Sequence, residues 1–423
     1  MATFCCDVTP PLGEAIYSSY QPLATVEHPL LAKGIVLDDG RHRYVLCAVD
    51  WCELCNSTYA LFRRRLAEAA ATDVSLVAIQ TVHQHTAPMG DADAFRLVDE
   101  TENPPPHVPA KFFEETADRV AAAAKESLGR LQAFDHIATG EAKVDRVASS
   151  RRVPGEDGKI RVRWSACLDP ALRAEPEGFI DPILKTITLA RGDEPLVRLH
   201  YYATHPQSFY GDPRASYDFP GIARQRLEEE EKVFQIYFTG CAGDVTAGKY
   251  NDRSRQARDE LAQRLYDGMK ASIAATRLAP VGAFQWRTVP LTLSLREDAG
   301  YTLAENLARM ADPKAAALAR LEAAMAVAFI RRSDRPIELS CLRIGETQVL
   351  HLPGEAMIEF QRFAQQLKPK QFVAVAAYGD CGPAYICTQR AYDEGGYEPG
   401  ASRVMPDSEA KLKAAIRQLL ADE

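Results

Sequence analysis

The sequence predicts an α/β fold in which a mixed sheet is flanked by helices. Short apolar runs alternate along the chain with longer amphipathic segments, and this alternation is typical of mixed α/β folds. In the longer segments, apolar residues recur at spacings of three and four, as on one face of a helix. We find neither an internal repeat nor a low-complexity linker among the 423 residues, so we expect residues 1–423 to form a single domain.

The expected strands are the short apolar runs, and the expected helices are the longer segments with helical spacing. The strands are Arg43–Val49, Val74–Ile79, Leu196–Tyr202, Val233–Phe238, Gln348–Leu352 and Phe372–Ala377. The helices are Ser57–Ala71, Ala110–Leu131, Pro220–Glu231, Arg253–Ala275, Leu303–Arg331, Ala356–Leu367 and Glu409–Ala421.

Charge and composition exclude several classes of protein. A net charge of -8 argues against nucleic-acid binding, which needs a basic surface to neutralise phosphates. The N-terminus has neither the charged nor the apolar region of a signal peptide, and no apolar run approaches the ~20 residues that span a membrane. Ten cysteines without an obvious pairing pattern favour a cytoplasmic protein. We expect a small-molecule substrate and no membrane span, and the sequence leaves a homo-oligomer open.

Two histidines lie shortly after the expected strand Val74–Ile79. His83 and His85 come after Val74–Ile79, in the segment Thr81-Val82-His83-Gln84-His85. Because side chains alternate along a strand, the two imidazoles are expected on one face, which is a common start to a zinc site. The alternative is a pair of loop histidines that bond to the backbone.

Two further expected strands end in the same way. His205 follows Leu196–Tyr202, and Glu355 follows Gln348–Leu352 after a Pro-Gly turn. Each residue has a plain structural interpretation, as a hydrogen-bonded histidine or as a carboxylate at a helix N-terminus. Strand ends are nevertheless where ligand sites of open α/β sheets gather.

A glycine-containing segment follows Val233–Phe238. It runs from Thr239 to Thr246 and holds Asp244. Small residues let backbone N–H groups approach a ligand, so the segment could stabilise an oxyanion, or it could be an ordinary turn.

Taken together, these strand ends predict a catalytic metal centre. Two imidazole nitrogens and one carboxylate, with a fourth position open for water, form a catalytic rather than a structural zinc set. The same donors favour Zn²⁺ over Mg²⁺. We therefore predict that His83, His205 and Glu355 bind zinc.

Six short blocks occur in order along most of the chain. They are VHQHTAP at 82–88, ATHPQS at 203–208, SYDFPG at 216–221, AGDVT at 242–246, LPGE at 352–355 and AYICTQRAYDEGGYEPG at 384–400. As an ordered set they resemble the catalytic domain of the neutral ceramidase family of zinc amidohydrolases. The resemblance implies that Tyr385 joins His83, His205 and Glu355 as a zinc ligand, and that His85 and Tyr397 line the catalytic pocket.

The chain also departs from the family pattern. Thr246 stands at the position of the family's proposed catalytic serine, which leaves orientation or oxyanion stabilisation as its expected roles. The sequence ends soon after Tyr397, so we expect no C-terminal immunoglobulin-like domain, and it shows no export signal. These differences favour a soluble substrate smaller than ceramide.

The predicted function is hydrolysis of an amide bond by zinc-activated water. Asp218 and Asp244 are expected to orient the histidine ligands, and Arg151 and Arg152 to recognise an anionic group of the substrate. Two alternatives stay open. One is zinc-dependent chemistry on an ester, lactone or sugar derivative, including lyase or isomerase steps, and the other is a non-catalytic binding protein on a degenerate enzyme fold.

Overall fold

Three sheets form the framework of the computed structural model, which describes residues 1–17 and 21–422. The first sheet has the order β1-β3-β4-β6, the second has the order β17-β8-β12-β13-β15, and the third has the order β18-β19-β20-β22. The strands are β1 (Ala2–Asp7), β3 (Leu31–Asp38), β4 (Arg43–Val49), β6 (Val77–Thr81), β8 (His136–Lys143), β12 (Ile183–Arg191), β13 (Glu194–Tyr202), β15 (Phe234–Thr239), β17 (Arg277–Pro280), β18 (Phe284–Leu291), β19 (Ile337–Ile344), β20 (Thr347–His351) and β22 (Phe372–Ala376).

Each sheet is built by the same succession of elements. Three strands pair antiparallel in chain order, and a fourth pairs parallel with the third. A helix makes the crossover to this fourth strand, since a parallel connection needs one. The crossover helices are α1 (Asn56–Ala70), α5 (Asp218–Glu231) and α9 (Ile358–Leu367).

A second helix completes each unit. It follows the fourth strand and packs against both the crossover helix and the first strand of its own sheet. These helices are α3 (Ala110–Ser127), α6 (Arg255–Ala274) and α12 (Ser408–Leu419). The expectation of no internal repeat is therefore wrong at the level of topology: the chain contains three units of one design, although their residues show no repeating pattern.

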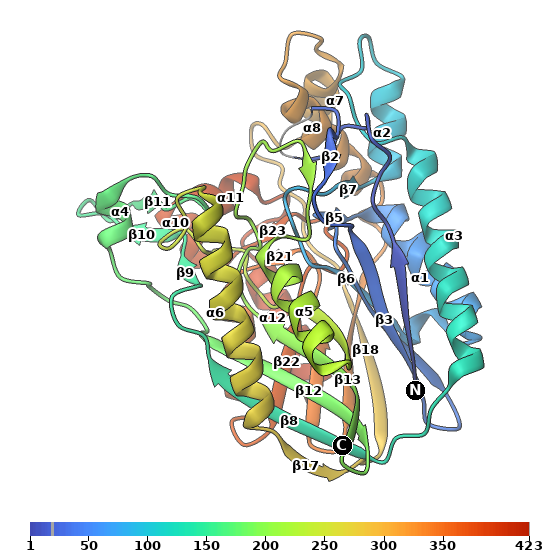
Figure 1. Cartoon of the computed structure of the whole chain (residues 1–423). Helices are drawn as coiled ribbons and strands as arrows, with labels where there is room; N and C mark the ends of the chain where they lie inside the picture. Colours follow the sequence, from blue (N-terminus) through green and yellow to red (C-terminus); the bar gives the residue numbers. More distant parts are fainter. Residues whose placement is uncertain (18–20, 423) are drawn as a thin grey trace.

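The remaining elements lie in the connections between these strands and helices. In Figure 1, α2, α7 and α8 gather at the upper end of the molecule, beside the short strands β5 and β7. The connecting elements are β2 (Thr25–Val26), β5 (Glu53–Leu54), β7 (Met89–Gly90), β9 (Ser149–Ser150), β10 (Arg152–Pro154), β11 (Ile160–Val162), β14 (Arg214–Ala215), β16 (Val245–Thr246), β21 (Glu355–Ala356), β23 (Tyr385–Ile386), α2 (Ala92–Asp99), α4 (Pro170–Ala174), α7 (Leu303–Ala311), α8 (Ala317–Arg331), α10 (Gln389–Glu394) and α11 (Tyr397–Ala401).

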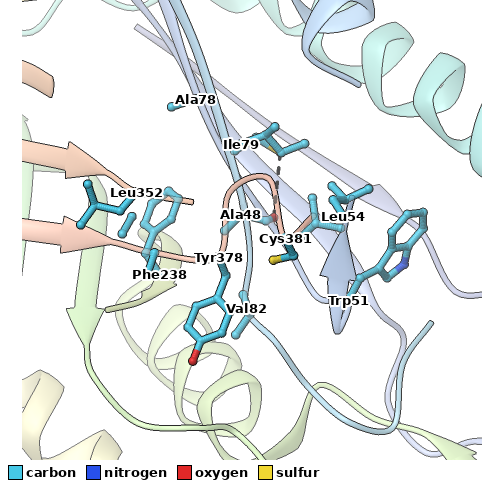
Figure 2. Close-up of a cluster of buried hydrophobic side chains, with 14 of the residues drawn as sticks. Ala48, Trp51, Leu54, Ala78, Ile79, Val82, Phe238, Leu352, Tyr378 and Cys381 are labelled. Carbon is cyan, nitrogen blue, oxygen red and sulfur yellow. Dashed lines mark hydrogen bonds between the residues drawn. The ribbon is translucent and has the colours of Figure 1, made fainter. Parts of the chain in front are cut away.

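The three sheets meet in a common apolar core. A small gap at its centre is lined by side chains of all three sheets, among them Leu46, Leu199 and Val349. Figure 2 shows another part of this core, where Ala48 of β4, Phe238 of β15 and Tyr378 after β22 lie in one buried cluster. Burial of each large apolar side chain contributes about 1.5–3 kcal/mol, so the core holds the sheets in fixed relative positions.

The predicted mixed α/β fold is confirmed, with local differences. The segment expected as strand Val74–Ile79 begins as a 3-10 turn, because the Asp73 side chain accepts a hydrogen bond from Ser75 N at 2.8 Å. The expected helix Leu303–Arg331 is two helices, α7 and α8, because Pro313 has no N–H and cannot lie inside a helix. The outer antiparallel strands β1, β3, β8, β12, β18 and β19 were not predicted.

Among the helices of the described residues, none combines the length and the apolar character that crossing a membrane requires.

A buried ion pair joins the first unit to the second. Arg224 of α5 donates from both terminal nitrogens to the Asp50 carboxylate, at 2.9 and 2.7 Å, and both side chains are at most 1% exposed. The Asp50 carboxylate also accepts from Leu31 N and from the Gln84 amide. Arg224 is therefore one of several donors that keep a buried negative charge satisfied.

Replacing Arg224 with alanine should destabilise the protein strongly. The Asp50 charge would stay buried without its cation, which costs about 3–5 kcal/mol in unfolding free energy. Urea denaturation followed by circular dichroism measures this change. Arg130→Ala, which breaks the exposed pair with Glu126, serves as control and should barely move the midpoint. Equal midpoints for the two variants would contradict the structural role of the buried pair.

Candidate functional site

The loops that leave the third and fourth strands of each unit pair with each other in parallel. β5 pairs with β7, β21 pairs with β23, and a single bridge joins His205 to Thr246. The three units thus place corresponding residue pairs at one end of the molecule. The pairs are Glu53 with Met89, His205 with Thr246, and Glu355 with Tyr385.

His83 reaches the same place from the end of β6. Its backbone has φ +74°, a left-handed conformation that costs energy for a residue with a side chain and is found mainly at functional sites. The Tyr378 ring stacks on the His83 imidazole, with centroids 4.3 Å apart and planes inclined by 26°. β6 ends at Thr81, so this turn, rather than strand alternation, directs His83 and His85 into the site.

His83, His205 and Glu355 converge on one point. Nε2 of His83 lies 3.1 Å from Oε2 of Glu355, and Nε2 of His205 lies 3.0 Å from the same oxygen. All three side chains are at most 5% exposed. Their ligand atoms all lie within 4.8 Å of one another, so the three residues could hold a metal ion.

Backbone carbonyls determine which nitrogen of each imidazole carries the proton. A carbonyl only accepts, so Nδ1 of His83 donates to Cys52 O at 2.8 Å and Nδ1 of His205 donates to Ala242 O at 2.7 Å. In the neutral rings, both Nε2 lone pairs then face the Glu355 carboxylate. Either a proton on one of the rings or a cation among these atoms relieves the repulsion, and the donor set fits a metal ion.

The charges of the three residues are strongly coupled. Burial opposes ionisation of His83, but the Glu355 carboxylate outweighs it and raises the pKa of His83. Burial likewise acts against the Glu355 anion, yet His83 and His205 hold its pKa well below the usual range. Burial and the Arg151 guanidinium lower the pKa of His205 to about 4. His205 is thus neutral at pH 7, with a lone pair free to bind a cation.

Arg151 and Tyr385 border the cluster. Nη1 of Arg151 donates to the Tyr385 hydroxyl at 3.1 Å, and Nη2 lies 3.1 Å from Nε2 of His205. The Tyr385 hydroxyl is 3.5 Å from the same His205 nitrogen. Burial raises the pKa of Tyr385 well above its usual value, against the opposing charge of Arg151. The guanidinium thus holds the phenol at the edge of the metal-binding group.

His85 contributes the third imidazole ring at the centre. Its Nε2 lies 3.3 Å from Nε2 of His83, and its ring contacts the Tyr17 ring with centroids 5.3 Å apart. Burial, followed by the charges of His83 and His205, holds the pKa of His85 well below its usual value. The ring is therefore neutral at pH 7.

A cavity of about 450 Å³ opens onto this group of residues. His85, Arg151, Tyr385 and Tyr397 form its inner end, where they contact the metal-binding residues. The volume suits a small organic molecule. The other lining residues are Tyr17, Trp164, Ser165, Ala166, Gln207, Tyr210, Arg253, Leu318 and Glu322.

Asp218 and Asp244 do not orient the histidine rings, contrary to expectation, because backbone carbonyls already occupy both Nδ1 atoms. Asp218 instead accepts from Ser208 N at 2.8 Å and braces the loop after His205. Asp244 accepts from Ile358 N at 2.9 Å, at the start of α9, and so holds the segment that carries Glu355. Both act on the backbone.

Arg152 faces away from the cavity and pairs with Glu398 at 2.8 Å and Glu394 at 3.1 Å. It therefore anchors α11, which begins at Tyr397, instead of meeting a substrate. The Thr246 hydroxyl accepts from Gly248 N at 3.1 Å and holds its own turn. A catalytic role for Thr246 stays a prediction.

Sequence reasoning missed two residues beside the centre. Glu53 is the counterpart of His205 and Glu355 in the first unit, and burial together with Glu355 raises its pKa to about 7. Its position just after a predicted strand was a usable signal, in the segment Asp50-Trp51-Cys52-Glu53. Tyr378 also follows a predicted strand, but only its left-handed backbone, φ +60°, reveals why it stacks on His83.

The fold is that of known ceramidase structures. Neutral ceramidase from Pseudomonas aeruginosa aligns over 98% of this chain and 72% of its own, with a TM-score of 0.72 and 16% identity. A ceramidase complexed with C2 aligns over 98% and 73%, with a TM-score of 0.70 and 15% identity. These similarities confirm the neutral-ceramidase-like fold that the motifs indicated. No protein-family model and no curated protein matches the sequence.

Gly243 leaves no room for a side chain beside Glu355. A Cβ atom at this position would lie 2.4 Å from the Glu355 carbonyl oxygen, so the backbone of the ligand would have to move. We expect Gly243→Ala to lower the unfolding free energy by about 1–3 kcal/mol. It should also weaken metal binding about 10- to 100-fold, as changes around metal ligands do.

Urea denaturation and zinc titration test this pair of effects. Gly129→Ala is the matched control, because a Cβ there meets no atom within 4 Å. If Gly243→Ala binds zinc as tightly as the control, close backbone approach does not position Glu355.

Proposed function

We propose that this protein is a zinc-dependent hydrolase that cleaves an amide bond of a small soluble substrate. One observation carries the proposal: two imidazole nitrogens with fixed tautomers face one oxygen of a buried carboxylate, at 3.0 and 3.1 Å. The ceramidase fold of the chain supports the choice of an amide over an ester, lactone or sugar derivative.

His83, His205 and Glu355 would hold the zinc ion, and the Tyr385 hydroxyl lies close enough to His205 to join them. A bound zinc ion would lower the pKa of a water molecule toward ~7 and polarise a carbonyl group. The separations of 3.0 and 3.1 Å are close to the roughly 3.3 Å that separates the ligands of tetrahedral zinc.

The residues around the cavity supply the remaining chemistry. Arg151 is buried, keeps its charge, and lines the cavity beside Tyr385 and His205, so its guanidinium can stabilise negative charge on a carbonyl oxygen there. The Tyr397 ring lies edge-on to the Tyr385 ring at 5.5 Å and adds a second hydroxyl. The surrounding protein excludes bulk water and strengthens these interactions.

His85 is the best candidate to move the proton. The reaction adds water across the amide carbon–nitrogen bond, so one proton must pass from the attacking water to the leaving nitrogen. His85 lines the cavity beside the metal-binding residues, so by its position it can take up that proton and pass it on to the amine. Thr246 fits a positioning role better than a nucleophilic one, because its hydroxyl already accepts a backbone hydrogen bond.

Metal analysis and activity measurements test the proposal. We expect one zinc ion per chain, and hydrolysis of N-acyl amines that is lost on chelation and restored by zinc. His205→Ala and Glu355→Gln should each weaken zinc binding by more than about 100-fold, which exceeds the usual effect of residues around the ligands. His136→Ala, on an exposed strand end, is the control and should keep its zinc. Full zinc content in His205→Ala would rule out this ligand set.

Arg151→Met should separate metal binding from catalysis. Without the guanidinium, kcat should fall about 10²- to 10³-fold, the usual loss for a removed oxyanion donor. Zinc content should persist, since none of the three ligands is changed. Steady-state kinetics on the same N-acyl amines, combined with metal analysis, gives both quantities. A variant that keeps its kcat would remove Arg151 from the mechanism.

A further inference from the structure

The walls of the cavity come from insertions and loops, not from the three sheets. Tyr17 lies between the first two strands of the first unit, and Trp164 lies at the corresponding place in the second. Leu318 and Glu322 belong to α8, which lies at this place in the third unit. These insertions thus form part of the wall, and the loops that carry the metal-binding group supply the rest, including Gln207 and Tyr210.

Two opposite charges in these walls make no hydrogen bond or close ion pair among the described residues, although Arg403 and Arg309 act on Glu322 from a greater distance. Within residues 1–17 and 21–422, neither the Arg253 guanidinium nor the Glu322 carboxylate takes part in a hydrogen bond or an ion pair. Both side chains line the same cavity yet do not pair with each other. Both side chains are exposed to solvent, and because both line one cavity they are placed to meet charged groups of a ligand.

The Tyr210 phenol lies within reach of both charges. Burial raises the pKa of this phenol, Glu322 raises it further, and Arg253 opposes the shift. Glu322 is also one helical turn from Leu318, so both side chains project from one face of α8 into the cavity. The helix therefore sets where the Glu322 side chain enters the cavity.

Arg253 is held in place by a buried asparagine. Nδ2 of Asn251 donates to the carbonyls of Ser165, Gln207 and Ser208, at 2.9, 3.2 and 3.0 Å, and Oδ1 accepts from Arg253 N at 3.1 Å. Asn251 itself is fully buried. It joins three segments of the cavity wall and fixes the turn in which Arg253 adopts φ +69°. Such a strained, braced turn is expected where a side chain must keep its position.

We propose that the substrate carries a zwitterionic amino-acid group, whose carboxylate pairs with Arg253 and whose ammonium pairs with Glu322. The inference rests on the proposed amide hydrolysis and names its substrate class. The amide would belong to an acylated side-chain amine of a diamino acid, and hydrolysis would yield a carboxylic acid and the free diamino acid. The aromatic walls, Trp164, Tyr17 and Tyr210, suit the apolar stem and attract the ammonium group.

A matched set of amides tests the proposal. The zwitterionic probes are side-chain N-acetyl diamino acids with one to four methylene groups between the amide nitrogen and the α-carbon. For the best chain length, three analogues keep the carboxylate alone, the ammonium alone, or neither. We expect kcat/KM to rise about tenfold for each charge, which corresponds to about 1.4 kcal/mol.

Two variants assign the charges to the two residues. Arg253→Met should bring the ratio of kcat/KM between carboxylate-bearing and carboxylate-free probes close to one and leave the ammonium ratio in place. Glu322→Gln should do the reverse. Arg255→Met, which changes an exposed arginine on α6 that pairs with Glu27, is the control and should preserve both ratios. Circular dichroism verifies that each variant is folded.

The outcomes separate the two levels of inference. If no amide is hydrolysed, charged or neutral, the proposed function itself fails. If the neutral amide is hydrolysed as well as the zwitterion, and Arg253→Met changes no ratio, then the hydrolase stands and the zwitterionic substrate class is wrong.

Discussion

The site depends on one buried carboxylate. Glu355 lies in the interior as an anion, and the two nearest partners of its Oε2 atom are imidazole nitrogens whose other nitrogen already donates to a backbone carbonyl. An uncompensated charge in this place would cost several kcal/mol. The neighbouring arginine, the tyrosine hydroxyl and the turns that hold both histidines are all arranged around the need for positive charge here.

The three repeated units explain how distant residues meet. In each unit the third and fourth strands run parallel, so their ends and the loops beyond them lie on one side. The common core positions those ends relative to one another. The same design leaves the connection between the first two strands of each unit free to grow, and these insertions form part of the cavity walls.

The candidate site was predictable where a residue with a metal-binding side chain follows an apolar strand. His83, His205 and Glu355 each do so, and their side chains have the donor atoms that zinc prefers. Tyr385 came only from the resemblance to a family, because nothing local distinguishes it among sixteen tyrosines. Asp218 and Asp244 were assigned to the histidine rings because carboxylates often take this role. Backbone carbonyls took it instead, and no sequence pattern marks a carbonyl that will accept from a side chain.

By itself, the sequence determined the mixed α/β class, the central strands and most helices, and it pointed to His83, His205 and Glu355 as candidate metal ligands, because periodicity and strand-end polarity are local properties. The tertiary structure alone decided the threefold repetition of the units, the meeting of Glu53, His205 and Glu355 at corresponding positions, and the cavity with its two opposite charges. These features depend on pairing between segments far apart in the chain. Such pairing reflects burial and geometry over all three sheets, and no local stretch of residues encodes it.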